Sequence, residues 1–308
     1  MKLPVKQILS VLILIVLLGF FAYYIYHHAS DFGQVRLVNP ILIFPIVIIS
    51  LLIALTNGLI IKYLVEPFDL KLRFKEWFGL SVITTFYNTI LPFRGGLLAK
   101  AAYLKKKHSF PFTGFIAMMA GVYVINFLVA GFLGLVSLLF IYLFYRIFNP
   151  LVLMIFGSVF LVSVFIALFS PKLPETGNSF FNKIIKVANG WHLIKDNRKI
   201  ILASSSVVVV QILLAVFSTT FMYNIFGVDI SFIKALFLAS ISPLLVLVGI
   251  TPAGLGINEA IAVFSAMVIG IIPAQSLSVA ILSRIIGTAV IFILGPIFSY
   301  LLLKRERK

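Results

Sequence analysis

The stretch Leu91-Pro-Phe-Arg-Gly-Gly-Leu-Leu-Ala-Lys-Ala101 interrupts an apolar part of the chain with a proline, two glycines and two basic residues. Proline removes a backbone N–H and glycine weakens a helix, so such a cluster ends one helix and allows another to begin. A second stretch, Thr251-Pro-Ala-Gly-Leu-Gly-Ile-Asn-Glu-Ala260, also has a proline, two glycines and an ionisable residue followed by alanine. The two stretches predict two helical hairpins within a chain of long apolar runs.

The composition of the chain is that of a membrane protein. Of its 308 residues, 62% are hydrophobic and 11% are charged, whereas a soluble domain has about 45–50% apolar and about 25% charged residues. This excludes a water-soluble enzyme or a disordered protein of this length. The net charge of +16 therefore indicates membrane orientation and contact with anionic lipid, not nucleic acid. We predict a single all-α domain over residues 1–308, a polytopic bundle of membrane helices.

Six apolar runs are predicted to cross the membrane, the first of them as an uncleaved helix: residues 8–26, 41–61, 123–145, 151–170, 201–226 and 276–303. The longer run from Phe112 to Tyr145 corresponds to about 51 Å of helix. That exceeds a hydrocarbon core of about 30 Å. We therefore expect this run to break near Gly121, so that only its second part spans the bilayer.

Two further segments, residues 77–107 and 233–272, are predicted to be re-entrant hairpins. Basic residues concentrate in the two chain ends and in segments 62–76, 93–111 and 171–200, which the positive-inside rule assigns to the cytoplasm. The first hairpin then enters from the cytoplasm and turns at Pro92–Gly96. The second enters from outside and turns at Pro252–Gly256. Their opposite orientation makes an inverted repeat, a frequent basis of transport sites. Ordinary spans with weakly sorted charges are the alternative.

Ionisable residues at membrane depth are the first candidates for function, because a charge at the bilayer centre costs at least about 2.5–3.5 kcal/mol. Four residues meet this condition, Arg94, Lys100, Glu259 and Arg284. A structural role remains open for each of the four, and it has a specific form for two of them. Lys100 can extend to the lipid headgroups, and Glu259 can cap its own helix or pair with Arg284.

The hairpin turns are predicted to form an anion site. The second helix of each hairpin begins at mid-membrane, where its free N–H groups and positive dipole end attract an anion. Three basic residues against one acid leave a positive surplus there. Asn126 and two other asparagines offer hydrogen bonds or hold helices together. The candidate substrate-binding residues are Asn88, Pro92, Arg94, Gly95, Gly96, Lys100, Pro252, Gly254, Gly256, Asn258, Glu259 and Arg284.

The chain lacks the residue patterns of catalysis and metal binding. It has no cysteine and four histidines, which gives no metal-ligand set. No carboxylate pair lies within one apolar segment, and Gly254-x-Gly256 lacks the βαβ context of a dinucleotide fingerprint. We therefore expect neither an enzyme nor a cofactor.

At these residues the chain resembles the membrane region of lysylphosphatidylglycerol synthases and the related stand-alone flippase-like proteins. The resemblance rests on Thr251–Ala260 followed by Arg284, and on Pro92–Ala101 with Tyr103-Leu104. The chain departs from the family pattern in three places: Leu97 stands where the family has an acid, and Lys100 where it has an arginine. An acidic–arginine pair often found in the next span is replaced by the neighbourhood of Gly121–Tyr123. The resemblance implies the lipid-handling half of such synthases, without the soluble aminoacyltransferase domain.

The sequence therefore predicts a lipid translocase that handles an anionic or phosphate-bearing lipid. Its expected location is the inner (plasma) membrane, with several spans and both termini in the cytoplasm. Two alternatives stay open: a membrane-embedded transferase acting on a lipid-linked sugar, and a scaffold that delivers lipid to a partner lipid-modifying enzyme. A homodimer is a further expectation.

Overall fold

The structure is a computed structural model in which residues 36–91, 94–169, 194–248 and 251–303 are described, together with residues 19, 23, 26, 174, 182, 185, 189, 191 and 192. These residues form helices and no strands. The predicted first span, residues 8–26, lies almost entirely outside the described residues.

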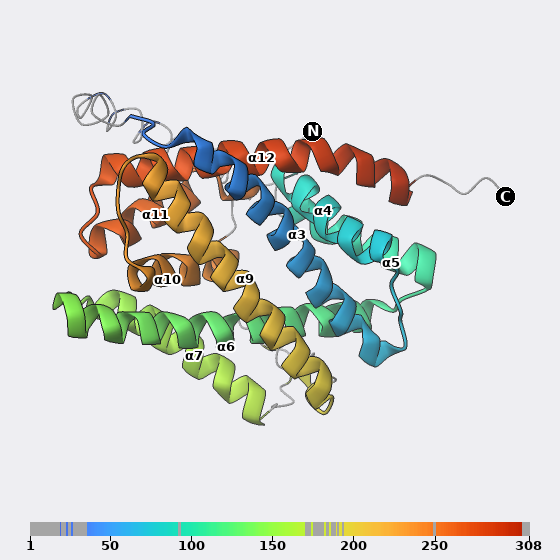
Figure 1. Cartoon of the computed structure of the whole chain (residues 1–308). Coiled ribbons are helices and arrows are strands. Elements are labelled where there is room, and N and C mark those ends of the chain that lie inside the picture. The colour runs from blue at the N-terminus through green and yellow to red at the C-terminus, as the bar shows by residue number, and fades with distance from the viewer. Residues whose placement is uncertain are drawn as a thin grey trace.

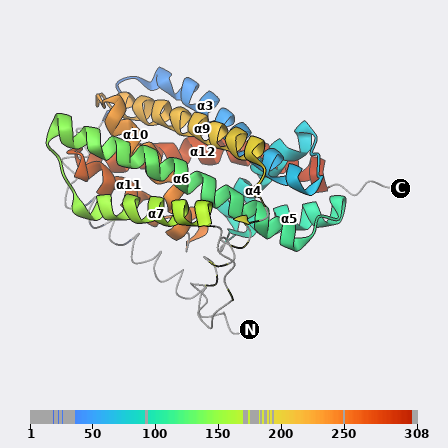
Figure 2. The ribbon, with the colours of Figure 1, turned by 90° about the horizontal axis from the view of Figure 1, so that it is seen from below.

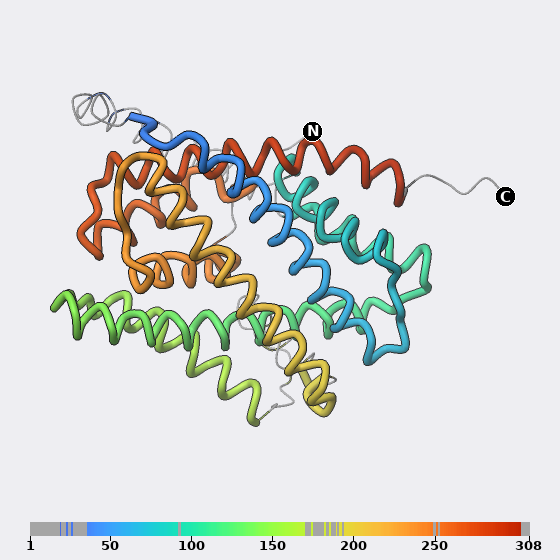
Figure 3. Tube along the Cα trace, viewed as in Figure 1, coloured from blue at the N-terminus to red at the C-terminus, as the bar shows by residue number. Residues whose placement is uncertain are grey.

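Within the described residues, five helices are long and apolar enough to cross a membrane. They are α3 (Ile43–Val65, between the short η1 at Pro40–Leu42 and η2 at Glu66–Phe68), α6 (Phe112–Tyr145), α7 (Pro150–Phe169), α9 (Arg198–Ile225) and α12 (Pro273–Leu303). The predicted all-α, multi-pass architecture is confirmed. Helices α3 and α9 are far apart in the chain but pack side by side through the middle of the molecule (Figure 3).

The expected break near Gly121 is wrong, because α6 is one continuous helix of 34 residues. Gly121 lies where a Cβ would come within 3.0 Å of the side chains of Leu64 and Ile194. The glycine therefore allows close packing of α6 against its neighbours and does not end the helix. At about 1.5 Å per residue, α6 is longer than the hydrocarbon core is thick.

Both proline–glycine stretches lie between consecutive helices. The first joins α4 (Phe74–Ile90) to α5 (Gly95–His108). The second follows α10 (Phe232–Ile241) and η4 (Ser242–Val248), contains η5 (Pro252–Gly254), and leads into α11 (Ile257–Val268). In Figure 1 the two hairpins have their bases at opposite ends of the molecule and their tips toward the middle, and the view from below agrees (Figure 2).

A buried carboxylate closes the base of the first hairpin. Glu76, near the start of α4, accepts hydrogen bonds of 2.9 Å from the Tyr103 hydroxyl and from the Arg73 backbone N–H, and lies 2.9 Å from His108 Nε2. Burial raises the pKa of Glu76, but these hydrogen bonds and the His108 charge outweigh it and leave the pKa below its ordinary value of 4.5. The two helices of the hairpin are thus tied together at their base.

The first hairpin also packs against the last helix. Gly79 of α4 and Gly295 of α12 lie where these two helices pack against each other. A Cβ at Gly79 would meet Phe298 and Leu302 at 2.7 Å, and one at Gly295 would meet Phe86 at 2.3 Å. Small residues at such contacts let helix backbones approach closely in a membrane, where packing rather than the hydrophobic effect holds helices together.

Candidate functional site

The tips of the two hairpins meet in the interior of the bundle. Arg94 directly precedes α5 and has a left-handed backbone conformation (φ 57°, ψ 48°). Its Nη2 donates a hydrogen bond to the carbonyl oxygen of Val246, 152 positions further along the chain in η4. A non-glycine residue in this conformation costs about 1–2 kcal/mol, so the surrounding fold holds Arg94 at the tip.

A cavity of about 400 Å³ lies where the tips meet. Its volume is in the range of small-molecule sites. The cavity is lined by α3, α4, α5, α6, α9, η4, η5 and α11, through Asn57, Asn88, Arg94, Leu97, Met119, Val122, Tyr123, Asn126, Phe127, Gln211, Ser242, Pro243, Leu245, Val246, Thr251, Ala253, Gly254 and Asn258.

Carboxamide side chains dominate the polar part of this wall. Asn57 of α3 accepts a hydrogen bond of 3.2 Å from Gln211 of α9. Asn88 of α4 accepts one of 2.9 Å from the Gly96 N–H at the start of α5. Asn126 of α6 contributes a third amide. Helices from both halves of the chain therefore bring amides to one place within an apolar bundle.

The close contact at the first tip explains the glycine pair. A Cβ at Gly96 would lie 1.9 Å from the backbone oxygen of Thr84 and 2.8 Å from Asn88 Oδ1. Only glycine allows α5 to begin this close to α4. The contact also places the Gly96 N–H against Asn88, which joins the start of α5 to the cavity wall.

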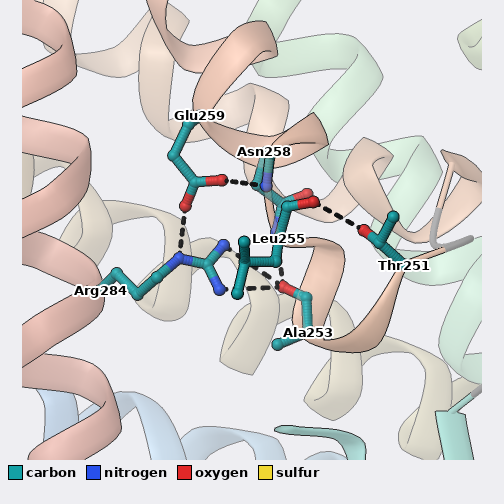
Figure 4. A network of polar contacts seen from close by, with 7 residues as sticks. Thr251, Ala253, Leu255, Asn258, Glu259 and Arg284 are labelled. Atoms are coloured by element: carbon teal, nitrogen blue, oxygen red, sulfur yellow. Dashed lines mark hydrogen bonds and ion pairs between the residues drawn. The ribbon is translucent and has the colours of Figure 1, made fainter. Parts of the chain in front are cut away.

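The second tip is held by an ion pair (Figure 4), and neither of its two residues lines the cavity. Arg284 of α12 donates a hydrogen bond to Glu259 Oε1, and its Nη1 and Nη2 lie 3.5 and 3.4 Å from the carbonyl oxygen of Ala253. Glu259 Oε2 accepts a hydrogen bond of 2.7 Å from the Gly256 N–H. Thr251 donates to the Leu255 carbonyl at 2.9 Å. Glu259 thus caps α11 and pairs with Arg284, the structural roles left open by the sequence.

The structure brings some predicted site residues to the cavity and places others elsewhere. Asn88, Arg94, Gly254 and Asn258 line it. The others do not: Gly95 and Gly96 are buried at the start of α5, while Gly256, Glu259 and Arg284 form or support the second turn. Pro92 and the Pro252 side chain lie outside the described residues. Of the predicted basic cluster, Arg94 alone reaches the cavity wall within the described residues.

Lys100 is buried but separate from the cavity. It is only 6% exposed, lies one helical turn after Gly96 on α5, and is absent from the cavity lining. Among the described residues it has no hydrogen bond or ion pair. An anion-binding role for Lys100 stays a prediction.

The helix starts at the two tips differ in charge. The first turn of α11 contains Glu259, whereas that of α5 contains no acid. A carboxylate at a helix N-terminus neutralises its partial positive charge. The start of α5, with Arg94 beside it, is therefore the more positive of the two.

Sequence reasoning missed Asn57, Gln211, Ser242 and Thr251 as cavity residues. Asn57 and Gln211 carried a usable signal, because each is an amide inside an apolar membrane helix, where polar side chains usually face the protein interior. Nothing in the sequence pairs them, since they are 154 positions apart.

Comparison with known proteins identifies the family. The family model described as the lysylphosphatidylglycerol synthase TM region matches residues 7–295. The search of curated proteins gave no match, and the search of solved structures gave none either. The match covers nearly the whole chain and includes both hairpins and every helix that lines the cavity. The chain therefore belongs to the family of the lysylphosphatidylglycerol synthase TM region.

Proposed function

We propose that this membrane protein is a lipid translocase in which the lipid headgroup occupies the cavity at the hairpin tips while the acyl tails remain in the bilayer. One observation carries the proposal: a cavity whose wall has five amide side chains and one arginine among apolar residues lies inside a bundle of apolar membrane helices. A polar headgroup meets a large free-energy barrier in hydrocarbon, because each unpaired polar group there costs several kcal/mol. The amides and the arginine of the cavity wall lower that cost, because they offer hydrogen bonds to a headgroup. The protein carries out no chemical step on the lipid.

The arrangement of the hairpins supports this mechanism. We propose that both are re-entrant, the first from the cytoplasm and the second from outside, as in an inverted repeat. In Figure 1 the C-terminal end of α3, the base of the α4–α5 hairpin and the C-terminal end of α12 lie on one side, and the base of the second hairpin lies on the other. Basic residues gather on the first side, which agrees with a cytoplasmic C-terminus in the plasma membrane.

Arg94 is the residue we propose to contact an anionic or phosphate-bearing headgroup. Its Nη2 donates a hydrogen bond to the Val246 carbonyl oxygen. The remaining guanidinium N–H groups have no partner among the described residues. Guanidinium groups bind phosphate through two parallel hydrogen bonds. The positive start of α5 adds to the attraction.

The test is translocation of fluorescent phospholipids in vesicles containing the purified protein, followed by quenching of the outer leaflet. We expect the Arg94→Gln variant to lose at least about tenfold in rate, since a charged hydrogen bond contributes roughly 1.5–3 kcal/mol. Arg146→Gln is the matched control, because Arg146 has nearly the same backbone conformation (φ 56°) at the end of α6 but is exposed and outside the cavity. Absence of translocation by the unaltered protein, or equal rates for both variants, would contradict the proposal.

A further inference from the structure

We infer, resting on the proposed function, that the cavity opens sideways to the bilayer between the start of α5 and η4, and that Arg94 is the latch of this opening. We call residues 94–98 and 242–248 the seam. Arg94 holds the seam closed through Val246 and releases it when an anion in the cavity takes the guanidinium group. The acyl chains of the bound lipid then extend through the open seam into the bilayer.

At the seam, a single element separates the cavity from the outside of the bundle on each side. Leu97 of α5 lines the cavity, whereas the next residue, Leu98, is 73% exposed and is not part of the lining. In the same way, Val246 of η4 lines the cavity, and Leu247 beside it is 61% exposed and outside the lining. Parting the two elements would therefore connect the cavity directly with the surrounding acyl chains.

One hydrogen bond joins the two sides of the seam. Arg94 Nη2 donates to the Val246 carbonyl oxygen, and no other hydrogen bond links residues 94–98 to residues 242–248, all of which are described. Packing contributes less to this junction, because α5 packs mainly against α4, while η4 packs against α10 and α6. The closed seam therefore depends on the Arg94 side chain.

The segment on the other side of the seam has the structure of a hinge. η4 follows directly on α10, yet its seven residues form a 3-10 helix, although such runs rarely exceed three or four residues. The hydrogen bonds of a 3-10 helix are less well aligned than those of an α-helix, and such stretches often mark hinges. Pro243 also lacks a backbone N–H to donate. η4 can therefore move relative to α10 when the latch is released.

A phosphate group in the cavity competes with Val246 for Arg94. A guanidinium group binds phosphate through two parallel hydrogen bonds, and each pair of N–H groups that can do so includes Nη2, the atom that contacts Val246. A hydrogen bond to an anionic oxygen is stronger than one to a neutral carbonyl, because both partners are then charged. An anion therefore binds the released form of Arg94 better than the latched form, and this difference shifts the seam toward the open state.

The test measures the width of the seam with spin labels. The chain has no cysteine, so Leu98→Cys/Leu247→Cys carries one label on each side, and electron paramagnetic resonance gives the distance between them in phosphatidylcholine nanodiscs. We expect phosphatidic acid to raise the fraction of molecules with a longer distance at least about tenfold, the effect of one charged hydrogen bond. Diacylglycerol with the same acyl chains lacks the phosphate and should leave this fraction unchanged.

Variants of the two arginines identify the latch in the same measurement. Arg94→Gln should show the longer distance without phosphatidic acid and respond no further to it. Arg146→Gln is the matched control, because Arg146 is exposed and outside the cavity lining, and it should respond like the unaltered protein. A short distance in Arg94→Gln, or a remaining response of this variant to phosphatidic acid, would overturn the latch.

A cross-link tests the opening with Arg94 intact. Joining the cysteines of Leu98→Cys/Leu247→Cys with a cleavable bismaleimide should lower the translocation of fluorescent phospholipids at least about tenfold, since lipid movement requires the seam to open. Cleaving the linker should restore the rate. Phe132→Cys/Phe160→Cys is the matched control, because these rings lie 6.2 Å apart between α6 and α7 and outside the cavity lining. Undiminished translocation with the seam cross-linked would overturn the inference.

The outcomes separate this inference from the proposed function. If phosphatidic acid widens the seam in an Arg94-dependent way but the unaltered protein moves no lipid across vesicles, the latch is correct and the protein is not a translocase. If lipid crosses equally well with the seam free and cross-linked, the protein is a translocase and the lateral opening lies elsewhere.

Discussion

The ion pair between Arg284 and Glu259 offers a direct test of how the second hairpin tip is held. The Glu259 side chain is 10% exposed and the Arg284 side chain 27% exposed. Removing one partner of a buried ion pair costs about 3–5 kcal/mol, because it leaves the other charge uncompensated. Since Arg284 retains about a quarter of its exposure, we expect a value near the lower limit. Glu259→Gln should therefore lower the free energy of unfolding by about 3 kcal/mol.

The glutamine substitution isolates the charge from the helix cap. A glutamine side-chain oxygen can still accept the hydrogen bond that the Gly256 N–H donates to Glu259, so the cap of α11 is retained. In the double variant Glu259→Gln/Arg284→Leu no uncompensated charge remains. The Ala253 carbonyl loses Arg284 but keeps the Asn258 amide at 3.3 Å. We expect the double variant to lie within about 1 kcal/mol of the unaltered protein, about the value of one hydrogen bond.

The measurement is unfolding in mixed micelles with increasing sodium dodecyl sulfate, followed by circular dichroism, with lipid translocation assayed in parallel. Glu66→Gln is the control, because Glu66 on η2 has no ion pair among the described residues, and its effect should stay within about 0.5 kcal/mol. Because neither Arg284 nor Glu259 lines the cavity, translocation should recover together with stability. If the double variant costs the sum of the two single variants, the pairing argument is refuted. If it is stable but inactive, Arg284 acts on the lipid directly.

Three further predictions concern the hairpins. Cysteines introduced at Lys71 and Lys105 should be labelled from the same side of intact cells, and labelling from opposite sides would exclude a re-entrant first hairpin. Gly256→Leu should abolish translocation while the protein still inserts, because Gly256 has a φ of 81° that a branched residue adopts at a cost; full activity would contradict this. Because the pKa of Glu76 is lowered in the folded protein, its contribution to stability is present above its ordinary pKa of 4.5 and is lost as pH falls through the lower folded value. Unfolding measurements should show this acid loss reduced in Glu76→Gln.

Local sequence signals predicted the helices well. Apolar runs set the predicted spans, and five of the six lie among the long helices of the described residues. The prediction was wrong for α6, where the length of the apolar run and the presence of Gly121 suggested that the helix breaks. The structure keeps the helix whole because Gly121 packs against Leu64 and Ile194. Glycine occurs at helix ends and also at close contacts between helices. The sequence alone does not show which of the two applies at a given position.

The cavity was only partly predictable. Asn88, Arg94 and Asn258 were found because they lie near the proline–glycine turns. Asn57 and Gln211 were missed because their contact joins α3 to α9, and no local pattern records which helices become neighbours. The same holds for the contact of Arg94 with Val246.

The sequence by itself determined that the protein lies in a membrane, where most of its helices run and to which family it belongs. These properties depend on hydrophobic runs and proline–glycine turns, which are short, local features of the chain. Tertiary structure alone decided which charges are free. It joined Arg284 to Glu259 across 25 positions and left Arg94 at the cavity. The physical reason is that a partner within a few ångströms stabilises a charge in an apolar bundle. Helix packing depends on the whole chain. It decides whether a charge pairs with another side chain or stays available to a ligand.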